Sequence, residues 1–588
     1  MLNKRLIIFL AFLLGAFTAA GVILYLHASV VKTVAFEAGV PISEPEPEPE
    51  PPEYIAAGIV PHHLVAREMI EEFFTEIAAS EPETIVLVSP DHWGRAQDAF
   101  SITGETEYFE APIDTRLQNV LRHGDSSNYF GVNEELMEGE HGLAGLVPFI
   151  VKLMPETQIV PIAIAANASS ETVDKVVSQL FLSEMGRTTV ISSTDFSHYL
   201  PSAAADMHDT ASIAVLENLQ FDKISDLELD CWQCLYFATS FADKHESRNA
   251  EMLNHTNSAK IVDSVDKANE VTSYVSMVYR EGELVEKYRP VSMLFVGDMM
   301  FGRYVETLMR THGNDYPFEN IFRFLKGVDI LHGNHEGPVV YSHYQTPNNS
   351  TSFSFSEDKA ATLKTYGFDV VTLANNHTLD RGQQGWLDSQ EILSKYGIGN
   401  HGHTYEVGDE YIYETQIGDQ EFEFLSYNTT FPWIDKAAAV EQVRRRATES
   451  EAMIIVSVHW GAEYKSVSNS YQQTFAHDLI DAGADVIIAH HPHVTQEIEE
   501  YNGKLIFYSL GNFIFDQYFS VNTQESYALG MEVGEDQIVY RIFPLQSRMS
   551  QPQLMSQEKS QTWLETLAAR SSESLREDIK QGIITVVK

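Results

Sequence analysis

The second half of the sequence contains a series of short polar motifs whose side chains can bind metal ions. Each motif follows a run of apolar residues, and together they supply carboxylate, amide and imidazole groups. These groups are the ligand set of dinuclear hydrolytic sites, in which metals about 3.5–4 Å apart activate water and stabilise a leaving oxygen. The motifs are Gly297-Asp298, Gly333-Asn334-His335-Glu336, Asn375-Asn376-His377 with Asp380, His459-Trp460-Gly461 and His490-His491-Pro492-His493.

Each motif alone is weak evidence, because a single His after a strand more often makes a structural hydrogen bond. The series as a whole is harder to explain as core, because imidazole is seldom fully buried. Pro492 fixes its own φ and restricts His491 to extended geometry, in which alternate side chains share a face. We therefore expect His491 and His493 to point at one site, which Asp298 and His377 reach from neighbouring strand ends.

A second, weaker series of polar motifs occupies the first half of the sequence. Histidine, carboxylate and thiolate groups together can hold iron, copper or zinc, although His is also a common polar residue near strand ends. The pair Cys231 and Cys234 is open to four interpretations: a disulfide, a redox pair, part of a metal site or two buried thiols. The motifs are Pro61-His62-His63, Ser89-Pro90-Asp91-His92, Glu140-His141-Gly142, Asp195-Phe196-Ser197-His198-Tyr199 and Asp230-Cys231.

Apolar segments of strand length precede these motifs and predict two α/β regions, at residues 54–287 and 290–551. In the first region the segments alternate with helical patterns, which is typical of a largely parallel sheet. Because strand ends converge at one edge of a sheet, ligands distant in sequence can meet there. The predicted strands are Thr84–Ser89, Gln158–Ala163, Thr188–Ser193, Ser292–Val296, Val370–Leu373, Met453–Val458, Val486–Ala489 and Leu505–Tyr508. We expect residues 552–588 to form a helical tail.

The N-terminal segment has the pattern of a membrane anchor. Leu6–Leu26 carries no charged residue, and a helix of about 20 apolar residues spans a bilayer. Lys4 and Arg5 precede it, which predicts a cytoplasmic N-terminus. We therefore predict that residues 1–32 are an uncleaved, single-pass signal anchor in the cell membrane. The alternative, a cleaved signal peptide, usually has a shorter apolar stretch. Residues 33–53, rich in Pro and Glu, then form an extended spacer to an extracytoplasmic bulk.

The composition indicates a folded, strongly acidic protein. The 588 residues carry a formal net charge of -45, and 44% of them are hydrophobic, which suits packed cores in more than one domain. The acidity argues against nucleic acid as a partner, because phosphate binding needs clustered Lys and Arg. It also argues against direct, metal-free contact with a polyanion, but it suits divalent cations.

The motifs of the second region resemble the CapA family of capsule, or poly-γ-glutamate, biosynthesis proteins. GDMMFGR, N-x-E-G-P, LANNHTLDRG, HWGAEY, HHPHV and YSLGNFIF occur in family order between Val291 and Asp516. The resemblance implies a layered sandwich of two sheets flanked by helices, as in calcineurin-like metallophosphatases. It implies divalent metal ions, with Mn, Zn or Fe as candidates, and the ligands Asp298, Asn334, Glu336, Asn376, His377, His459, His491 and His493.

The same resemblance suggests His459, His377 and Asp380 as catalytic residues. The first motif departs from the phosphatases because it contains Asp298 without the D-x-H pattern, so one expected His ligand is missing. His335 stands where the CapA pattern usually has an apolar residue and is a further candidate ligand.

The motifs of the first region resemble the Memo family, the B component of the AmmeMemoRadiSam group. PHH, SPDHWG, GEHGLAGLVPFI and SSTDFSHY occur in family order between Gly58 and Arg280. The resemblance implies a fold similar to class III extradiol dioxygenases. Its metal positions match His62, His92 and Cys231, with Asp195 and His198 beside them. Trp232 follows Cys231 where the family usually has Gly.

Three functions are compatible with these patterns. The first is a surface-polymer factor that makes, anchors or trims an anionic extracellular polymer, with that polymer or its synthesis complex as partner. The second is a metal-dependent hydrolase that acts on a phosphoester or amide outside capsule formation. The third is a Memo-like redox enzyme in which the CapA-like half only binds.

Overall fold

The computed structural model describes residues 53–588 apart from 185, 263–269 and 432. The predicted anchor, and the predicted spacer up to residue 52, lie outside the described residues. Within the described ranges, no helix combines the length and the apolar character that are needed to cross a bilayer.

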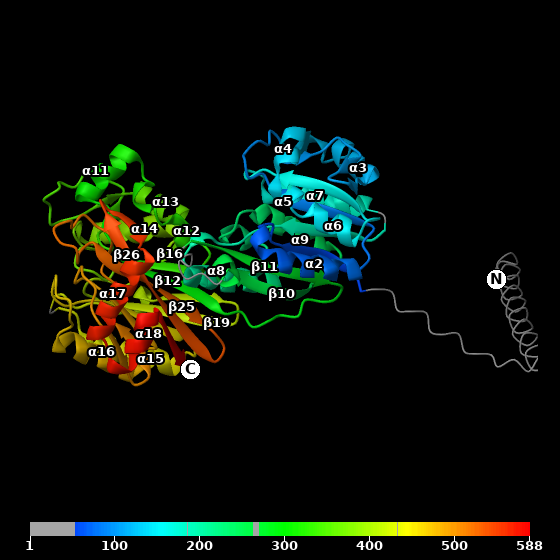
Figure 1. Cartoon of the computed structure of the whole chain (residues 1–588). Helices are drawn as coiled ribbons and strands as arrows, with labels where there is room; N and C mark the ends of the chain where they lie inside the picture. The colour runs from blue at the N-terminus through cyan, green and yellow to red at the C-terminus, as the bar shows by residue number, and fades with distance from the viewer. Residues whose placement is uncertain (1–52, 185, 263–269, 432) are drawn as a thin grey trace, which may run out of the picture. The chain divides into compact units, whose positions relative to one another are not determined.

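The first region contains a mixed sheet with helices around it (Figure 1). At the centre of the sheet, four strands pair in parallel in the order β1 (Ile55–Val60), β8 (Thr188–Ser193), β2 (Thr84–Pro90) and β7 (Gln158–Ile164). β11 (Val271–Arg280) pairs antiparallel with β1, and β10 (Asn249–Asn257) pairs antiparallel with β11. Beyond β7 lie β3 (Phe100–Ile102), which is antiparallel to β7, and β6 (Phe130–Val132). The prediction of a largely parallel sheet is confirmed at its centre and at the pair β3–β6, while β10–β11, β11–β1 and β7–β3 pair antiparallel.

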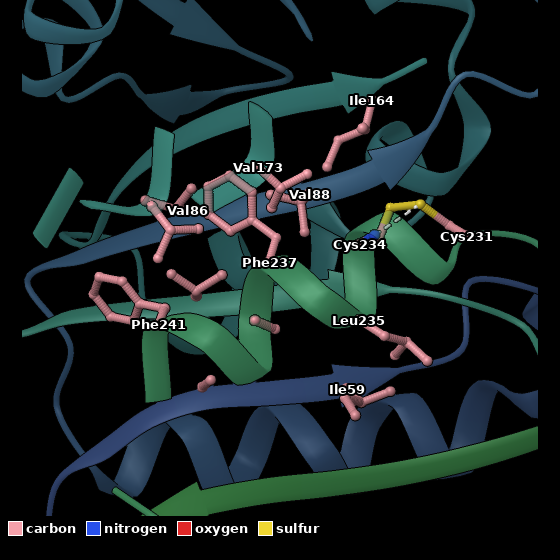
Figure 2. Packing of buried hydrophobic residues seen from close by; sticks show 14 of the residues in the cluster. Ile59, Val86, Val88, Ile164, Val173, Cys231, Cys234, Leu235, Phe237 and Phe241 are labelled. Carbon is pink, nitrogen blue, oxygen red and sulfur yellow. Dashed lines mark hydrogen bonds between the residues drawn. A yellow bond between two sulfur atoms is a disulfide. The ribbon is translucent and has the colours of Figure 1, made fainter. Parts of the chain in front are cut away.

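Helices cover both faces of this sheet, because side-chain direction alternates along each strand. Val86 and Val88 belong to the apolar cluster that includes α7 and α9 (Figure 2). Ile85 and Leu87 belong to the opposite cluster, which includes α2 and α6. The first pair of helices is α7 (Ser170–Ser183) and α9 (Trp232–Lys244), and the second pair is α2 (Arg67–Ala79) and α6 (Val147–Leu153). Both faces are therefore apolar, and polar groups for chemistry remain at the strand ends.

The second region contains two sheets that pack face to face. One consists, in order, of β17 (Gly399–His401), β16 (Phe368–Thr372), β13 (Ile330–His335), β12 (Val291–Met299), β25 (Glu525–Val533), β26 (Gln537–Arg548) and β27 (Gln551–Leu554). The other consists of β18 (Tyr413–Ile417), β19 (Gln420–Asn428), β20 (Met453–His459), β21 (Val486–His490), β23 (Lys504–Phe507) and β22 (Ile498–Tyr501). One apolar cluster joins Phe295 and Met531 of the first sheet to Phe424 and Ile488 of the second.

Helices cover the outer faces of this sandwich. On the first sheet they are α11 (Arg303–His312), α13 (Asp358–Thr365) and α14 (Gly382–Lys395), and on the second α15 (Lys436–Glu449) and α16 (Ser470–Ala482). The result is a layered α/β arrangement. All eight predicted strands are present, with ends shifted by no more than a few residues.

The C-terminal segment is not only helical. α17 (Gln557–Arg570) and α18 (Arg576–Gln581) agree with the predicted helical tail. However, β28 (Ile583–Val587) pairs antiparallel with β26, so the prediction was wrong for these residues. Their sequence, IITVV, consists of β-branched residues, which favour a strand.

The strand register places the polar motifs together. β12, β13 and β16 are parallel neighbours, so their carboxyl ends lie at one edge of the first sheet. Asp298 at the end of β12 is in register with Asn334 of β13. In the second sheet His459 of β20 is in register with His490 of β21.

Candidate metal centre

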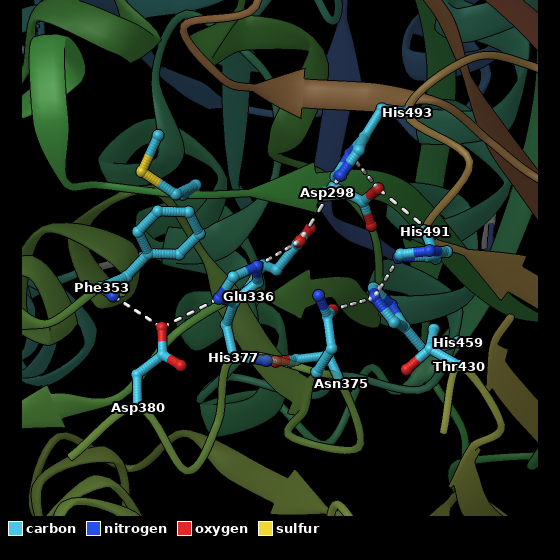
Figure 3. Close-up of polar contacts among 12 residues, drawn as sticks. Asp298, Glu336, Phe353, Asn375, His377, Asp380, Thr430, His459, His491 and His493 are labelled. Carbon is cyan, nitrogen blue, oxygen red and sulfur yellow. Dashed lines mark hydrogen bonds and ion pairs between the residues drawn. The ribbon is translucent and has the colours of Figure 1, made fainter. Parts of the chain in front are cut away.

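Three ionisable side chains, Asp298, Glu336 and His493, meet at these strand ends. One ligand atom from each lies within 4.8 Å of the others. His493 Nδ1 is 3.2 Å from Asp298 Oδ2, and His493 Nε2 is 3.7 Å from Glu336 Oε1 (Figure 3). All three side chains are buried. They form an enclosed carboxylate–imidazole group of the kind that binds transition metals.

Glu336 has unsatisfied polar atoms. Neither carboxylate oxygen has a hydrogen-bond partner among the described residues, although both are buried. Burial raises the pKa of Glu336 to about 8. A buried carboxyl without partners costs free energy, so the site favours a group that binds those oxygens.

The electrostatics of Asp298 and His493 differ from those of Glu336. Burial opposes ionisation of Asp298, but His490 and His493 hold the pKa of this carboxyl well below its usual range. Burial alone would lower the pKa of His493, but the carboxylates of Glu336 and Asp298 outweigh it and raise the pKa to about 9. A proton on His493 therefore offsets carboxylate charge in the cation-free protein.

A second group, centred on His459, adjoins the first. His459 Nε2 is 2.7 Å from Asn376 Oδ1 and 3.1 Å from His491 Nδ1. Asn334 donates from Nδ2 to Asp298 Oδ1 over 2.8 Å and lies 3.4 Å from His459 Nδ1, which connects the two groups. Burial lowers the pKa of His459 well below its usual range and that of His491 to about 3. Both imidazoles are thus neutral near pH 7, which is the form that binds metals.

His377 lies at the edge of the group. Its Nε2 is 3.9 Å from Glu336 Oε1, and its Nδ1 is 2.8 Å from Asp380 Oδ2. Asp380 Oδ2 also accepts the backbone N–H of Phe353 over 2.6 Å (Figure 3). A carboxylate on one ring nitrogen orients the imidazole and leaves the other nitrogen free for the site. The structure thus brings together all nine site residues predicted in this region: Asp298, Asn334, Glu336, Asn376, His377, Asp380, His459, His491 and His493.

The backbone of the histidine motif differs from the prediction. Extended geometry was expected at His491, but φ is 96° at His491 and 56° at His493. Non-glycine residues rarely adopt positive φ, and such conformations persist where the surrounding structure holds them. The backbone N–H of His491 donates to Asp298 Oδ2 over 3.3 Å, which ties the turn to the site. Both imidazoles therefore reach one group through a tight turn and not through strand alternation.

Some residues of the group were not predicted as ligands. His490 Nδ1 lies 3.4 Å from Asp298 Oδ1, and His493 Nδ1 lies 3.0 Å from Asn512 Oδ1. Asn375 donates from Nδ2 to Asn334 Oδ1 over 3.1 Å. All three occur in the recognised motifs, so the signal was in the sequence.

His335 is not part of the group. Its Nδ1 donates to the carbonyl of Gly337 over 2.8 Å, and its ring lies against those of Phe301 and Phe355. His335, the further candidate ligand, thus makes its contacts with the backbone and with aromatic rings of the core.

A second cluster lies at the strand ends of the first region. His62 follows β1, His92 follows β2 and Asp195 follows β8. His62 Nε2 is 3.6 Å from Asp195 Oδ2 and 3.5 Å from Asp230 Oδ2, and His92 Nε2 is 3.7 Å from Asp230 Oδ2. Two overlapping ligand groups result, namely His62 with Asp195 and Asp230, and His62 with His92 and His141.

The pKa values of the two central histidines of this cluster, His62 and His92, are shifted in opposite directions. Burial lowers the pKa of His62 to about 4. Burial also acts to lower the pKa of His92, but Asp230 and Glu140 outweigh it and raise the pKa to about 9. Glu140 Oε1 is 2.6 Å from His92 Nδ1, which leaves Nε2 directed toward Asp230. Glu140 is thus an orienting group for His92.

The sequence prediction for this cluster was incomplete. His141 and Asp230 occur in the recognised motifs but were not among the predicted ligands. His198 is close enough to Asp230 and Asp195 for their charges to act on its pKa, which burial lowers below its usual range.

The prediction of Cys231 as a metal ligand is corrected. Cys231 forms a disulfide with Cys234 at the start of α9 (Figure 2). A metal binds the thiolate form of cysteine, and a disulfide sulfur is not a thiolate. The carboxylate of the preceding residue, Asp230, lies in the cluster instead.

Both clusters fit a divalent metal by the chemistry of their side chains. The first has the carboxyl groups of Asp298 and Glu336, the latter with unpartnered oxygens, and the imidazole of His493, with the neutral imidazoles of His459 and His491 beside it. The second has imidazoles and carboxylates with an orienting glutamate. Imidazole and carboxylate donors are compatible with Mn, Zn and Fe, the candidates that the resemblance implied.

Comparison with known proteins finds a matching family model for each region. Residues 292–517 match the family model described as bacterial capsule synthesis protein PGA_cap, and residues 41–278 match the model described as Memo-like protein. The PGA biosynthesis protein CapA of Bacillus subtilis is 32% identical over 243 residues, and the capsule biosynthesis protein CapA of Bacillus anthracis is 30% identical over 248 residues. Each alignment covers 39% of this chain, and the chain spans 64% and 60% of those relatives, respectively.

The first region has relatives of its own. A MEMO1 family protein of Caldivirga maquilingensis is 23% identical over 242 residues, which cover 39% of this chain and 84% of that protein. The chain thus joins a region that matches the Memo-like model to a region that matches the bacterial capsule synthesis model PGA_cap.

Proposed function

We propose that this protein is a membrane-anchored, extracytoplasmic factor in the synthesis, anchoring or processing of a capsule or poly-γ-glutamate polymer, and that it uses a divalent metal site in its second region. The relatives named CapA support the link to capsule or PGA formation. The polymer, or the complex that makes it, is the proposed partner. The proposed organisation is an anchor at residues 1–32, a spacer at 33–53, a Memo-like domain at 54–287, a CapA-like domain at 290–551 and a tail at 552–588.

The observation that carries the metal proposal is the carboxyl group of Glu336. Both of its oxygens are buried without a hydrogen-bond partner among the described residues, within reach of Asp298 and His493. Isolated buried carboxylates are strongly disfavoured, and a metal cation removes that penalty. No other described carboxyl group has both oxygens buried and unpartnered.

The architecture is consistent with the finer fold assignment. We propose that the second region is a calcineurin-like metallophosphatase sandwich and that the first is related to extradiol dioxygenases. Two stacked sheets with helices outside, and polar groups at the strand ends, support the first assignment. A parallel-centred sheet with His62 and His92 at its strand ends supports the second.

Asp298, Glu336 and His493 would hold one metal ion, and His459, His491 and Asn376 offer ligands beside it. A bound divalent metal supplies Lewis-acid chemistry at such a site. The chain itself keeps His459 and His491 neutral by burial. Asp380 fixes the ring of His377 through its Nδ1, so that its Nε2 is available to exchange a proton with a bound group.

The direct test compares metal content and surface polymer in the wild type and in Glu336→Gln. We expect the variant to lose metal from the second region and polymer from the cell surface. Normal polymer on cells that carry the metal-free variant would refute the proposal that the metal site drives function.

The location has a separate test. The disulfide between Cys231 and Cys234 supports an oxidising compartment outside the cytoplasm. Protease added to intact spheroplasts should degrade the folded part of the chain. Full-length protein recovered from the soluble cytoplasm would contradict the anchor.

A metal-dependent hydrolase that is not tied to capsule is the second candidate. The juxtaposition of His377 and Asp380 with the metal group favours it, because this pair is suited to proton transfer. Release of phosphate or amine from model phosphoesters and peptides, lost in His377→Ala, would support it. The redox alternative predicts instead a redox-active metal in the His62–His92 cluster, detectable by electron paramagnetic resonance.

A further inference from the structure

Arg570, at the end of α17, is a cation without a carboxylate partner. No Asp or Glu oxygen of the described residues lies within 4.0 Å of its guanidinium nitrogens, and its Nε atom is buried without a hydrogen-bond partner. Its Nη2 donates to Thr495 Oγ1 over 2.7 Å. Burial lowers the pKa of this guanidinium below its usual range.

Other arginines of the protein with little solvent exposure form ion pairs with carboxylates. Arg289 pairs with Asp329, Arg303 with Asp516 and Arg446 with Glu423. The charge of Glu497 acts on Arg570, but that carboxylate accepts the backbone N–H of Ser468 over 3.1 Å and also its hydroxyl. Arg570 thus keeps an excess positive charge in a protein whose formal net charge is -45.

A cavity of about 350 Å³ opens beside Arg570. This volume is within the usual range of small-molecule pockets, about 300–1,000 Å³. Lys559 also lines it, but its Nζ pairs with Glu525 Oε1 over 2.8 Å. The indole of Trp563 and the polar side chains of Asn522 and Thr566 also line the cavity.

A second unsatisfied group lies next to this cavity. The hydroxyl of Tyr527 is buried and has no hydrogen-bond partner among the described residues. Its ring centroid is 5.7 Å from that of Trp563, and it interacts electrostatically with Arg570. Two polar atoms without hydrogen-bond partners, Arg570 Nε and the Tyr527 hydroxyl, together with an aromatic wall, are features of a binding site for an organic anion.

We propose that this cavity binds an organic carboxylate, with the carboxylate on Arg570 and the carbon skeleton against Trp563. A guanidinium matches a carboxylate through two parallel hydrogen bonds, which explains why Arg and not Lys occupies the position. The assignment stands independently of the metal site. Thr495, the partner of Arg570, lines the cavity and comes two residues after His493 in the sequence, so the cavity adjoins the segment that follows the histidine motif.

The test is calorimetric titration of the full chain with glutarate, a dicarboxylate, and with glutaramide, its uncharged analogue. Inorganic phosphate is the third probe. We expect saturable binding of glutarate to the wild type and none of glutaramide. Arg570→Gln should weaken glutarate binding about tenfold or more, because a charge-assisted hydrogen bond is lost. Arg570→Lys should fall between the two.

Arg576→Gln is the matched control, since Arg576 is an exposed arginine on the next helix and does not line the cavity. It should bind glutarate as the wild type does. Absence of glutarate binding to the wild type up to about 10 mM would overturn the proposal. So would equal binding by Arg570→Gln and wild type, or binding of phosphate alone. If Arg570→Gln does not fold, Arg570→Lys provides the same comparison.

Discussion

His493 Nε2 lies 3.7 Å from Glu336 Oε1, and neither oxygen of that carboxyl group has a hydrogen-bond partner among the described residues. The contact joins the residue that follows β13 to the turn that follows β21, so it links the two sheets of the second region. Burial disfavours the charge of Glu336 and raises its pKa, whereas the raised pKa of His493 depends on a charged Glu336 beside it. The two side chains therefore make opposite demands on the charge of the Glu336 carboxyl group. A metal cation would resolve this conflict.

Glu336→Gln should abolish metal-dependent stabilisation of the second region. In the wild type a metal at about 100 times its dissociation constant adds about 2.7 kcal/mol to the free energy of unfolding. The variant should lose this increment and keep the stability of the metal-free wild type within about 1 kcal/mol, because glutamine has the same shape. Thermal unfolding with and without added Mn, Zn or Fe measures both quantities. Glu441→Gln, on the exposed face of α15, is the control, and an equal metal response in Glu336→Gln and wild type would refute the assignment.

His493→Asn should remove metal binding and surface polymer while the protein stays folded. The backbone at His493 has φ 56°, a conformation that Asn tolerates better than Ala does. Asparagine therefore separates loss of the imidazole from added backbone strain. Metal per chain, surface polymer and the unfolding temperature should be measured together, with His312→Asn, an exposed histidine in α11, as the control. Unfolding of His493→Asn would show that the imidazole is structural.

For His491 the corresponding variant is glycine, because φ is 96° at this position. His491→Gly should lose metal and polymer without lowering the unfolding temperature by more than a few degrees. His491→Ala should show the same loss of function with a larger loss of stability, because alanine carries the strain of the left-handed backbone. Normal polymer in both variants would remove His491 from the site.

In the first region, removal of the disulfide should leave metal binding intact. Cys231→Ser combined with Cys234→Ser should keep the metal content and lower the free energy of unfolding by about 2 kcal/mol, since the bridge closes a short loop. Asp230→Asn should instead lower the metal content, because this carboxylate faces both His62 and His92. Metal analysis of the two variants checks the assignment, and loss of metal in the serine variant alone would restore Cys231 as a ligand.

Glu306 should make the stability of the second region sensitive to acid. Burial tends to raise the pKa of Glu306, but His343 and Arg310 outweigh it, so the pKa falls below the ordinary value of 4.5. The unfolded chain therefore binds the proton more readily, and the stabilisation is present above pH 4.5 and is lost as the pH falls through the folded-state pKa. In chemical denaturation between about pH 3 and 7, Glu306→Gln should reduce the slope of stability against pH on the acid side. An unchanged slope would contradict the role of this ion pair.

Local sequence patterns were sufficient to predict the strands and most of the site. Segments such as Met453–Val458 are apolar over the length of a strand, and a buried strand needs little more information than that. The order of the motifs then located the site residues of the second region, because side chains at the carboxyl ends of parallel strands converge for geometric reasons. The β-branched residues of Ile583–Val587 also carried a strand signal, which the helical residues before them obscured.

Other features depend on packing between distant segments, and only the tertiary structure decided them. The orphaned oxygens of Glu336 result from burial by residues far away in sequence, so no local pattern reports them. The positive φ of His491 opposes the preference that Pro492 imposes, and it is held by contacts such as that with Asp298. Asp230 takes the place of Cys231 in the first cluster because the sulfur of Cys231 is bonded to Cys234, whereas the Asp230 carboxylate faces His62. Sequence fixes which groups are available at each strand end, but burial and long-range contacts decide their charge, orientation and partners.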